Sequence, residues 1–442
     1  MNRPHCLVPA LLASLITLTL TSVAQASEPL PDCHVGAYTL TDRSSLDIGP
    51  GEEGQLRWRR PDGTSGSFPI AGPHSGTSTL GWTGRPDGHR VTLHECQAGT
   101  IEIDGVVGHR LALPTLDTRF ASDGINLVGR LVMPPGDAAV PVVVLLHGSE
   151  HDGALLSNSL QRRLPAQGIG VFVYDKRGTG ASDGKYTQDF TQLADDAVQA
   201  LQEARRLGGA RVARIGYQGP SQGGWIAPLA ANKAGADFVI VGFGLAVSVI
   251  EEDRSAVALN IRDKGYPPEV MAKAMTLVDA ADALAMTPSP EVFDRFAAVR
   301  DPLRSEPWFR DVRGDFAWAL LNLKRDEVVP LAKMFDFGTP WLYDPMTTIA
   351  AVTAPQLWIL GSDDIDAPSA ETVRRLALLR AAGRPISTAV FPHAEHGILQ
   401  YEVGPDGQRL STRNPDGYLQ LMVDFARGAP FKPRYGDAEL RR

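Results

Sequence analysis

The stretch "RIGYQGPSQGGW", residues 214–225, joins an apolar run to a serine set between glycines. Its Gly219-Pro220-Ser221-Gln222-Gly223 fits G-x-S-x-G, where glycines two positions before and after the serine permit a sharp, strained strand-to-helix turn. A strand-like run, "RVARIGYQG", precedes the pattern, and "GWIAPLAANKAG" can continue as a helix with Pro228 in its first turns. This context predicts that Ser221 is a nucleophile, the alternative being a hydroxyl in an ordinary glycine-rich turn.

A second match shows how little the five residues say without their context. Gly180-Ala181-Ser182-Asp183-Gly184 also fits G-x-S-x-G, but it follows "YDKRGT" and so lies past the end of its strand. No helix-forming run starts at Gly184. We therefore expect Ser182 to lie in a loop.

The segments around Ser221 alternate between two kinds of pattern. A helical run at 189–207 places Phe190, Leu193, Ala197 and Leu201 at three- and four-residue spacing, and 158–167 is long enough for another helix. Continuous apolar runs, typical of strands buried on both faces, lie at 141–148, 168–178, 211–219, 237–244 and 355–361. This alternation predicts an α/β fold, a mostly parallel sheet with helices on both faces.

A long insertion, about residues 246–345, separates the last two of these strands. Its pattern is helical, with Ser289 as a candidate N-cap before Pro290. It is rich in Met and Trp, which either form a packing core or line the underside of a lid as an apolar acyl pocket. No single one of these residues is assigned to substrate.

A serine hydroxyl needs a base to take its proton, and the base needs an acid to orient it. Asp364 in "GSDDIDAP" lies where a carboxylate can emerge from the end of a strand, with Asp363 and Asp366 as alternatives. His396 in "AVFPHAEHGI" lies in a loop after a further strand, with His393 as its rival. The chain order serine, aspartate, histidine is the order expected of this topology.

Together these features resemble the α/β-hydrolase superfamily over about residues 117–427. The elbow "GPSQGG", the "HG" after the first buried strand, "YDKRGTGAS" and the late "HG" carry the resemblance. Within the superfamily, "LLHGSE" and "YDKRGTGAS" are most similar to bacterial serine esterases and serine aminopeptidase-like hydrolases. The resemblance implies the α/β-hydrolase fold with Ser221 as nucleophile, His396 as base and Asp364 as acid.

The resemblance also implies an oxyanion hole built from the backbone N–H groups of Ser149 and Gln222. Glu150 departs from the family pattern, since many relatives carry a small residue there. Its carboxylate either repels anionic substrates, holds a substrate amine or points into solvent. "HGSEHDG" and "HAEH" fit no well-known zinc spacing, so we expect neither a metal nor a cofactor.

The N-terminal region is expected to hold a signal peptide and a separate small domain. Residues 1–26 combine Arg3, a long apolar run and the small residues of "AQA", a secretory pattern cut after Ala26; a retained membrane anchor is the alternative. Residues 27–114 contain short apolar runs punctuated by Asp-Gly turns, which predict a β-rich domain without a recognisable motif.

We expect export to a periplasmic or extracellular location. After cleavage of the signal peptide, Cys33 and Cys96 are the cysteines that remain in the chain. Such a pair most simply forms a disulfide, the alternative being two buried thiols. The remaining layout is a hydrolase domain at 115–427 and a C-terminal tail at 428–442.

The overall charge of the chain limits the classes of binding partner that can be expected. The chain has 43 Lys and Arg against 51 Asp and Glu, a formal net charge of −8, without a dense basic cluster. Neither nucleic acid nor an anionic membrane is an expected partner, no stable membrane insertion is expected after signal cleavage, and the oligomeric state is not indicated.

The sequence therefore predicts an exported serine hydrolase that cleaves small-molecule carboxylic esters through an acyl-enzyme. An apolar lid over an uncharged nucleophile suits acyl chains. A serine peptidase of the same fold, holding a substrate amine on Glu150, is one alternative, and a non-catalytic binding protein is another. Export argues against a thioesterase, because coenzyme A esters are cytosolic.

Overall fold

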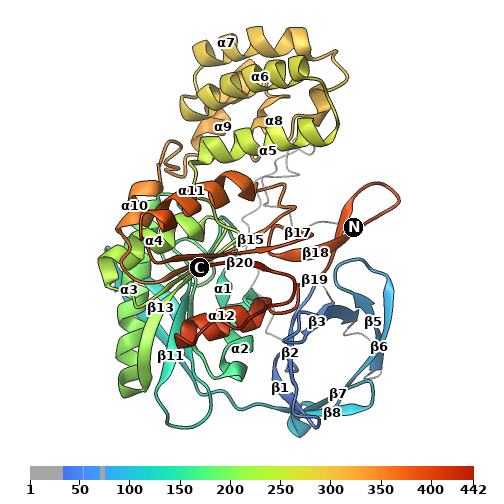
Figure 1. Cartoon of the computed structure of the whole chain (residues 1–442), viewed down its shortest axis with the longest axis vertical. Coiled ribbons are helices and arrows are strands. Elements are labelled where there is room, and N and C mark those ends of the chain that lie inside the picture. The colour runs from blue at the N-terminus through green and yellow to red at the C-terminus, as the bar shows by residue number, and fades with distance from the viewer. Residues whose placement is uncertain (1–32, 53, 70–74) are drawn as a thin grey trace, which may run out of the picture.

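The computed structural model describes residues 33–52, 54–69 and 75–442 (Figure 1). The signal peptide predicted for residues 1–26 lies outside these described residues. The described chain forms a small β-barrel, a mixed sheet flanked by helices, and a helical layer beyond one end of that sheet. None of its described helices is both long and apolar enough to cross a membrane.

The N-terminal strands form a closed barrel in which each strand pairs antiparallel with the next and β1 also pairs with β8. Its interior is filled by apolar side chains such as Ile48, Trp58 and Phe68, so it is a packed core. The strands are β1 (Gly36–Leu40), β2 (Ser45–Pro50), β3 (Gln55–Arg59), β4 (Ser65–Pro69), β5 (Ser75–Leu80), β6 (Pro86–Leu93), β7 (Thr100–Ile103) and β8 (Val106–Arg110).

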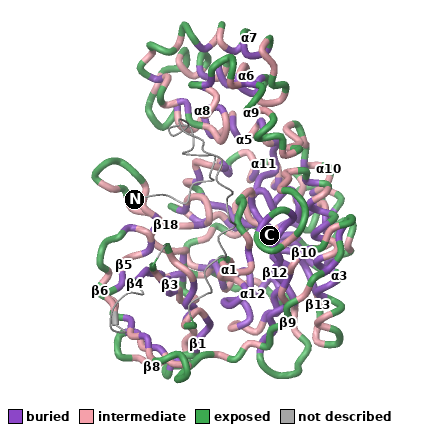
Figure 2. Tube along the Cα trace, turned by 180° about the vertical axis from the view of Figure 1, so that it is seen from behind, coloured by how far each residue is buried: buried purple, intermediate pink, exposed green. Residues whose placement is uncertain are grey.

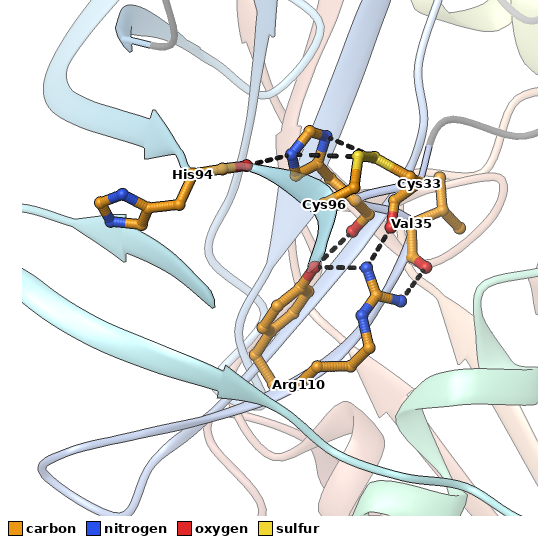
Figure 3. Close-up of a disulfide and its surroundings, with 7 residues drawn as sticks. Cys33, Val35, His94, Cys96 and Arg110 are labelled. Carbon is orange, nitrogen blue, oxygen red and sulfur yellow. Dashed lines mark hydrogen bonds between the residues drawn. A yellow bond between two sulfur atoms is a disulfide. The ribbon is translucent and has the colours of Figure 1, made fainter. Parts of the chain in front are cut away.

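A disulfide joins Cys33 and Cys96 at one end of this barrel, as expected from the sequence (Figure 3). Their Cα atoms are 5.9 Å apart, a normal span for such a bond. The Arg110 guanidinium donates hydrogen bonds to the carbonyl oxygens of Cys33 and Val35. The disulfide and Arg110 therefore fix the chain entering β1 against the end of the barrel.

The larger sheet has the order β20-β16-β15-β14-β13-β11-β12-β10-β9. From β12 to β16 neighbouring strands are parallel, while β9 and β10 at one edge and β20 at the other are antiparallel. The strands are β9 (Thr115–Ser122), β10 (Ile125–Val132), β11 (Val140–Leu145), β12 (Gly170–Tyr174), β13 (Val212–Pro220), β14 (Val239–Gly242), β15 (Gln356–Gly361), β16 (Ile386–Phe391) and β20 (Glu439–Arg441). The predicted mostly parallel sheet is confirmed, and residues 439–441 add an edge strand within what the sequence indicated only as a tail.

Helices cover both faces of this sheet, and the central strands divide between two apolar cores (Figure 2). In β11, Val142 and Val144 face one core, whereas Val143 and Leu145 face the other, because successive side chains alternate across a strand. The first core includes α3 (Phe190–Gly208), α4 (Gly223–Ala234), α10 (Met346–Ala351) and α11 (Ser369–Ala381); the second includes α1 (Ala154–Ser157) and α12 (Tyr418–Arg427).

One predicted helix is shorter than expected. The run 158–167 forms only α2 (Leu160–Arg163), followed by a 3-10 turn over Pro165–Gln167. Pro165 lacks the N–H that a continuing α-helix would use, which explains the early end.

The insertion after β14 forms the helical layer, with its own core around Val257, Leu277, Phe296 and Trp308. Ser289 caps α7 as predicted, since its hydroxyl accepts from the N–H of Val292. The helices are α5 (Val249–Asp263), α6 (Pro268–Met286), α7 (Pro290–Arg300), α8 (Ala317–Leu320) and α9 (Val328–Met334). Most large apolar side chains of the insertion therefore pack against one another.

A small sheet of β17 (Ala394–Glu395), β18 (Leu399–Val403) and β19 (Arg409–Arg413) lies beside the barrel (Figure 1). The N–H of Trp82 donates to the carbonyl of Ser411 at 2.9 Å, and the N–H of Asn414 donates to that of Gly63 at 3.2 Å. The barrel thus contacts the end of β19, the last strand of the small sheet whose first strand, β17, ends next to His396.

Candidate active site

Ser221 lies in a sharp turn between β13 and α4. Its backbone φ is +48°, a value that non-glycine residues rarely adopt. A Cβ at Gly219 would lie 2.2 Å from the carbonyl oxygen of Gly223, and one at Gly223 would lie 2.9 Å from that of His147. Both glycines of the G-x-S-x-G pattern are therefore required by close backbone approaches.

The side chains of Ser221, His396 and Asp364 form a continuous line of hydrogen bonds. His396 Nε2 is 3.1 Å from Ser221 Oγ, and His396 Nδ1 is 2.9 Å from Asp364 Oδ2. Asp364 Oδ1 accepts the N–H groups of Asp366 and Ala367 at 3.1 and 2.8 Å. Asp364 is buried, so these bonds hold its carboxylate in one orientation.

The rival residues lie elsewhere. The His393 side chain is 87% exposed and 3.6 Å from Asp363, which accepts the Tyr401 hydroxyl at 2.8 Å. Ser182 lies in a loop as predicted, where its hydroxyl donates to the carbonyl of Asp175 at 2.6 Å and accepts the N–H of Val128 at 2.8 Å. Ser182 thus anchors a loop.

Several carboxylates surround the His396 imidazole. Burial lowers the pKa of His396, but Asp364, Asp366 and Asp315 favour the imidazolium and together raise this pKa to about 9. The ring also packs edge-on against Phe243, with 4.8 Å between ring centroids. The site therefore stabilises a positive charge on His396.

The turn that carries the "HG" residues packs beside Ser221, since a Cβ at Gly148 would lie 3.6 Å from Ser221 Cβ. Side chains from "YDKRG" and beyond hold this turn: Lys176 Nζ donates to the Gly148 carbonyl at 2.7 Å, and the Tyr186 hydroxyl donates to the Ser149 carbonyl at 2.6 Å. Neither Lys176 nor Tyr186 is singled out by a sequence motif, although the polar "YDKRG" directly after an apolar strand is a usable signal for Lys176.

The predicted oxyanion donors lie at this turn and at the start of α4. Gln222 is the N-cap of α4, where the first backbone N–H groups of a helix have no partner within it. The helix dipole also favours negative charge there. Ser149 follows Gly148 in the turn beside Ser221.

Glu150 points toward His147, with 3.1 Å between Glu150 Oε1 and His147 Nδ1. Its side chain is half exposed. Burial disfavours the charged form of Glu150, but hydrogen bonding and attraction from His147 and attraction from Lys176 outweigh it and lower the pKa to about 2. Glu150 therefore carries a negative charge next to the turn.

The helical layer brings further acidic groups that the sequence did not single out. Glu252 and Asp315 are hydrogen-bonded to each other. Burial, together with neighbouring carboxylates, raises the pKa of Glu252 well above its usual range and that of Asp315 to about 8. The pair is near Asp364, and the raised pKa values favour its protonated form close to His396.

Among the described residues, the side chains close enough to share a metal ion are Cys33, His34 and Cys96 in the barrel, whose two thiols are joined to each other. This group lies apart from Ser221, in a different domain.

Part of the chain is similar in sequence to known proteins. Residues 137–273 match the family model described as serine aminopeptidase, S33. The quorum-quenching protein AidA of Acinetobacter baumannii is 29% identical over 111 residues, which are 25% of this chain and 36% of that protein, so the match spans about a third of the relative's length.

Two solved structures are also similar. An esterase of Pyrococcus furiosus has a TM-score of 0.41 and 15% identity, covering 64% of this chain and 84% of its own. The acylaminoacyl peptidase of Pyrococcus horikoshii has a TM-score of 0.40 and 16% identity, covering 81% and 53%. The order of the sheet and the serine turn between β13 and α4 are those of an α/β-hydrolase fold, and residues 137–273 within it match the serine aminopeptidase family model.

Proposed function

We propose that this protein is a serine hydrolase that cleaves carboxylic esters. The observation that carries the proposal is the hydrogen-bonded line Ser221–His396–Asp364, with distances of 3.1 and 2.9 Å. A serine next to a base that is itself oriented by an acid is the arrangement needed for an activated nucleophile.

In the acylation step, Ser221 Oγ attacks the ester carbonyl carbon while its proton moves to His396 Nε2. The carbonyl electrons move onto oxygen, and the N–H groups of Ser149 and Gln222 bind the resulting oxyanion. The intermediate collapses, the bond to the alkoxy oxygen breaks, and His396 returns the proton to the departing alcohol.

In the deacylation step, His396 takes a proton from water, whose oxygen attacks the Ser221 ester. The acid leaves, and the proton returns to Ser221 Oγ. The Asp364 carboxylate stabilises the imidazolium in both steps.

The first experiment is intact mass spectrometry of the protein after treatment with a fluorophosphonate, alongside turnover of p-nitrophenyl esters of increasing acyl length. One adduct is expected, and Ser221→Ala removes both the adduct and ester turnover. Ser182→Ala is the matched control, because that serine fits the same pattern and anchors a loop. An unlabelled wild-type protein without ester turnover refutes the proposal and favours a non-catalytic binding role.

A second candidate function is cleavage of amides or esters that carry a free amine. The ionised, half-exposed carboxylate of Glu150 next to the Gly148 turn favours it, since a substrate ammonium group can pair with that charge. Faster turnover of aminoacyl anilides than of neutral esters, lost in Glu150→Gln, would establish this alternative. Equal activity of Glu150→Gln on both substrate types would exclude a role for Glu150 in selecting amines.

We also propose that the protein is exported. The apolar run in residues 1–26 and the Cys33–Cys96 disulfide support this, because disulfides persist in oxidising compartments. Fractionation of cells should place the protein in the periplasm or medium, beginning at Ser27; an uncleaved cytosolic product contradicts it.

A further inference from the structure

The seam between the barrel and the hydrolase domain contains more positive than negative charge. Here α2 packs against β1 and β2. Asp47 of the barrel is buried and accepts from Arg162 at 2.6 Å and from Arg59 at 3.1 Å. Both carboxylate oxygens of Asp47 are used by these two guanidinium groups.

Arg163, the next residue of α2, is left without a counter-charge of its own. It is buried at 7% exposure, and its Nη2 has no hydrogen-bond partner among the described residues. Arg60, from the barrel side, pairs through Nη2 with Asp104 at 3.9 Å, but its buried Nε has no hydrogen-bond partner in the described part of the chain. A buried cation without a partner is strongly unfavourable, so Arg163 needs an acceptor, and the free Nε–H of Arg60 can donate to the same acceptor.

Arg60 and Arg163 line one small cavity, together with Asp47 and Arg59. Its volume is about 10 Å³, room for a single water-sized species. A larger groove of about 290 Å³ lies next to this cavity, and Pro61 and Leu419 line both. Groups of both signs line the groove: Asp62, Asp416, Lys432 and Arg434.

We propose that this cavity binds a small inorganic anion, a halide such as chloride, between Arg163 of the hydrolase domain and Arg60 of the barrel. Three guanidinium groups (Arg59, Arg162 and Arg163) share one carboxylate, so an anion, unlike a neutral water, offsets the remaining charge. Because its two donors come from different domains, the bound anion joins the barrel to the hydrolase domain. The inference does not depend on the proposed esterase activity.

Diffraction with bromide tests the site directly. Crystals of the protein soaked in sodium bromide should show an anomalous peak within hydrogen-bonding distance of the Arg163 guanidinium. Density for water alone, or a carboxylate of the chain seated against Arg163, overturns the proposal. This experiment needs no variant.

Thermal unfolding tests whether the anion binds in solution. Sodium chloride replaces sodium gluconate at constant ionic strength, so that general screening stays the same. The Tm of the wild type should rise and then saturate with chloride, since a ligand that binds only the folded state stabilises it by mass action. An identical Tm in both salts overturns the proposal, even if bromide binds in crystals.

Arg163→Gln distinguishes an anion site from a merely structural arginine. Without chloride the variant should be at least as stable as the wild type, because it removes an unpaired buried charge; with chloride the wild type should be the more stable. A variant that is less stable by the same amount in both salts overturns the inference. Arg205→Gln, at an exposed arginine on α3, is the control and should keep the wild-type chloride response.

Discussion

Replacing Asp364 with Asn tests how the site controls the proton on His396. Asp364 Oδ2 accepts from His396 Nδ1, while Oδ1 accepts two backbone N–H groups, those of Asp366 and Ala367. Asn has one oxygen, and the two backbone donors claim it. The amide NH₂ then points at His396 Nδ1 and donates to it, which moves the imidazole proton to Nε2, where it blocks acceptance of the Ser221 proton.

The size of the effect follows from the 2.9 Å separation of His396 Nδ1 and Asp364 Oδ2. At an effective dielectric constant of about 20, a full imidazolium–carboxylate attraction at this distance amounts to about 6 kcal/mol. Loss of this stabilisation in the transition state, together with the wrong tautomer, is expected to lower kcat/KM about 10⁴-fold.

The assay is p-nitrophenyl ester hydrolysis, with circular dichroism and Tm to confirm that the isosteric variant folds. Asp364→Ala is the control: it removes the charge but cannot donate to Nδ1, so it should be more active than Asp364→Asn. If Asp364→Asn stays within about tenfold of the wild type, Asp364 does not serve as the acid. Activity of the Ala variant below that of the Asn variant would refute the tautomer reasoning.

Further predictions concern the pH profile of His396, the serine turn, the Asn414 side chain and the disulfide. Only neutral His396 can accept a proton, and its pKa is raised to about 9, so kcat/KM should increase from neutral to alkaline pH. Asp366→Asn should shift this increase to lower pH, because it removes a carboxylate that raises the pKa of His396. An unchanged pH profile would contradict the role of Asp366. Gly223→Ala puts a methyl group 2.9 Å from the His147 carbonyl oxygen, so the turn should be displaced and kcat should fall about 100-fold. Ester turnover and the rate of fluorophosphonate labelling measure this effect. Labelling at the wild-type rate would contradict the predicted displacement. Asn414 Nδ2 donates to the Ile398 carbonyl at 2.8 Å near His396, so Asn414→Ala should lower kcat about fivefold with KM unchanged, and a rise in KM alone would indicate a different role. The double variant Cys33→Ser, Cys96→Ser removes a link between residues that are 63 positions apart in the chain. Its free energy of unfolding, measured by denaturant titration, should fall by up to about 4 kcal/mol. An unchanged midpoint would show that Arg110 alone is enough to hold the chain that enters β1.

The local patterns of the sequence were sufficient to predict the α/β fold, the serine turn and a short list of candidates for the acid and the base. Apolar runs ending in glycine predicted the central strands, because a strand buried on both faces needs apolar residues at every position. The serine turn was recognisable because only glycine fits where a Cβ would meet a backbone carbonyl, as at Gly219 and Gly223.

The choice between neighbouring candidates depended on tertiary structure. Asp363 and Asp364 are adjacent in the chain, and only the direction in which each leaves the end of β15 brings Asp364 to His396 and sends Asp363 to Tyr401. The pairing of residues 439–441 with the edge of the sheet could not be predicted either, since this strand is short and its partner, β16, is distant in the chain.

Contacts between charged residues of distant segments could not be predicted from any local sequence pattern. The Glu252–Asp315 pair, the Lys176 bond to Gly148 and the arginines around Asp47 join residues that are far apart in the chain. Sequence periodicity reports which face of an element is apolar, whereas a buried charge and its partner meet only once the elements have packed. The sequence by itself therefore determined the scaffold and the types of reactive residue; the packing decided which of them meet, how His396 is charged, and where the barrel joins the hydrolase domain.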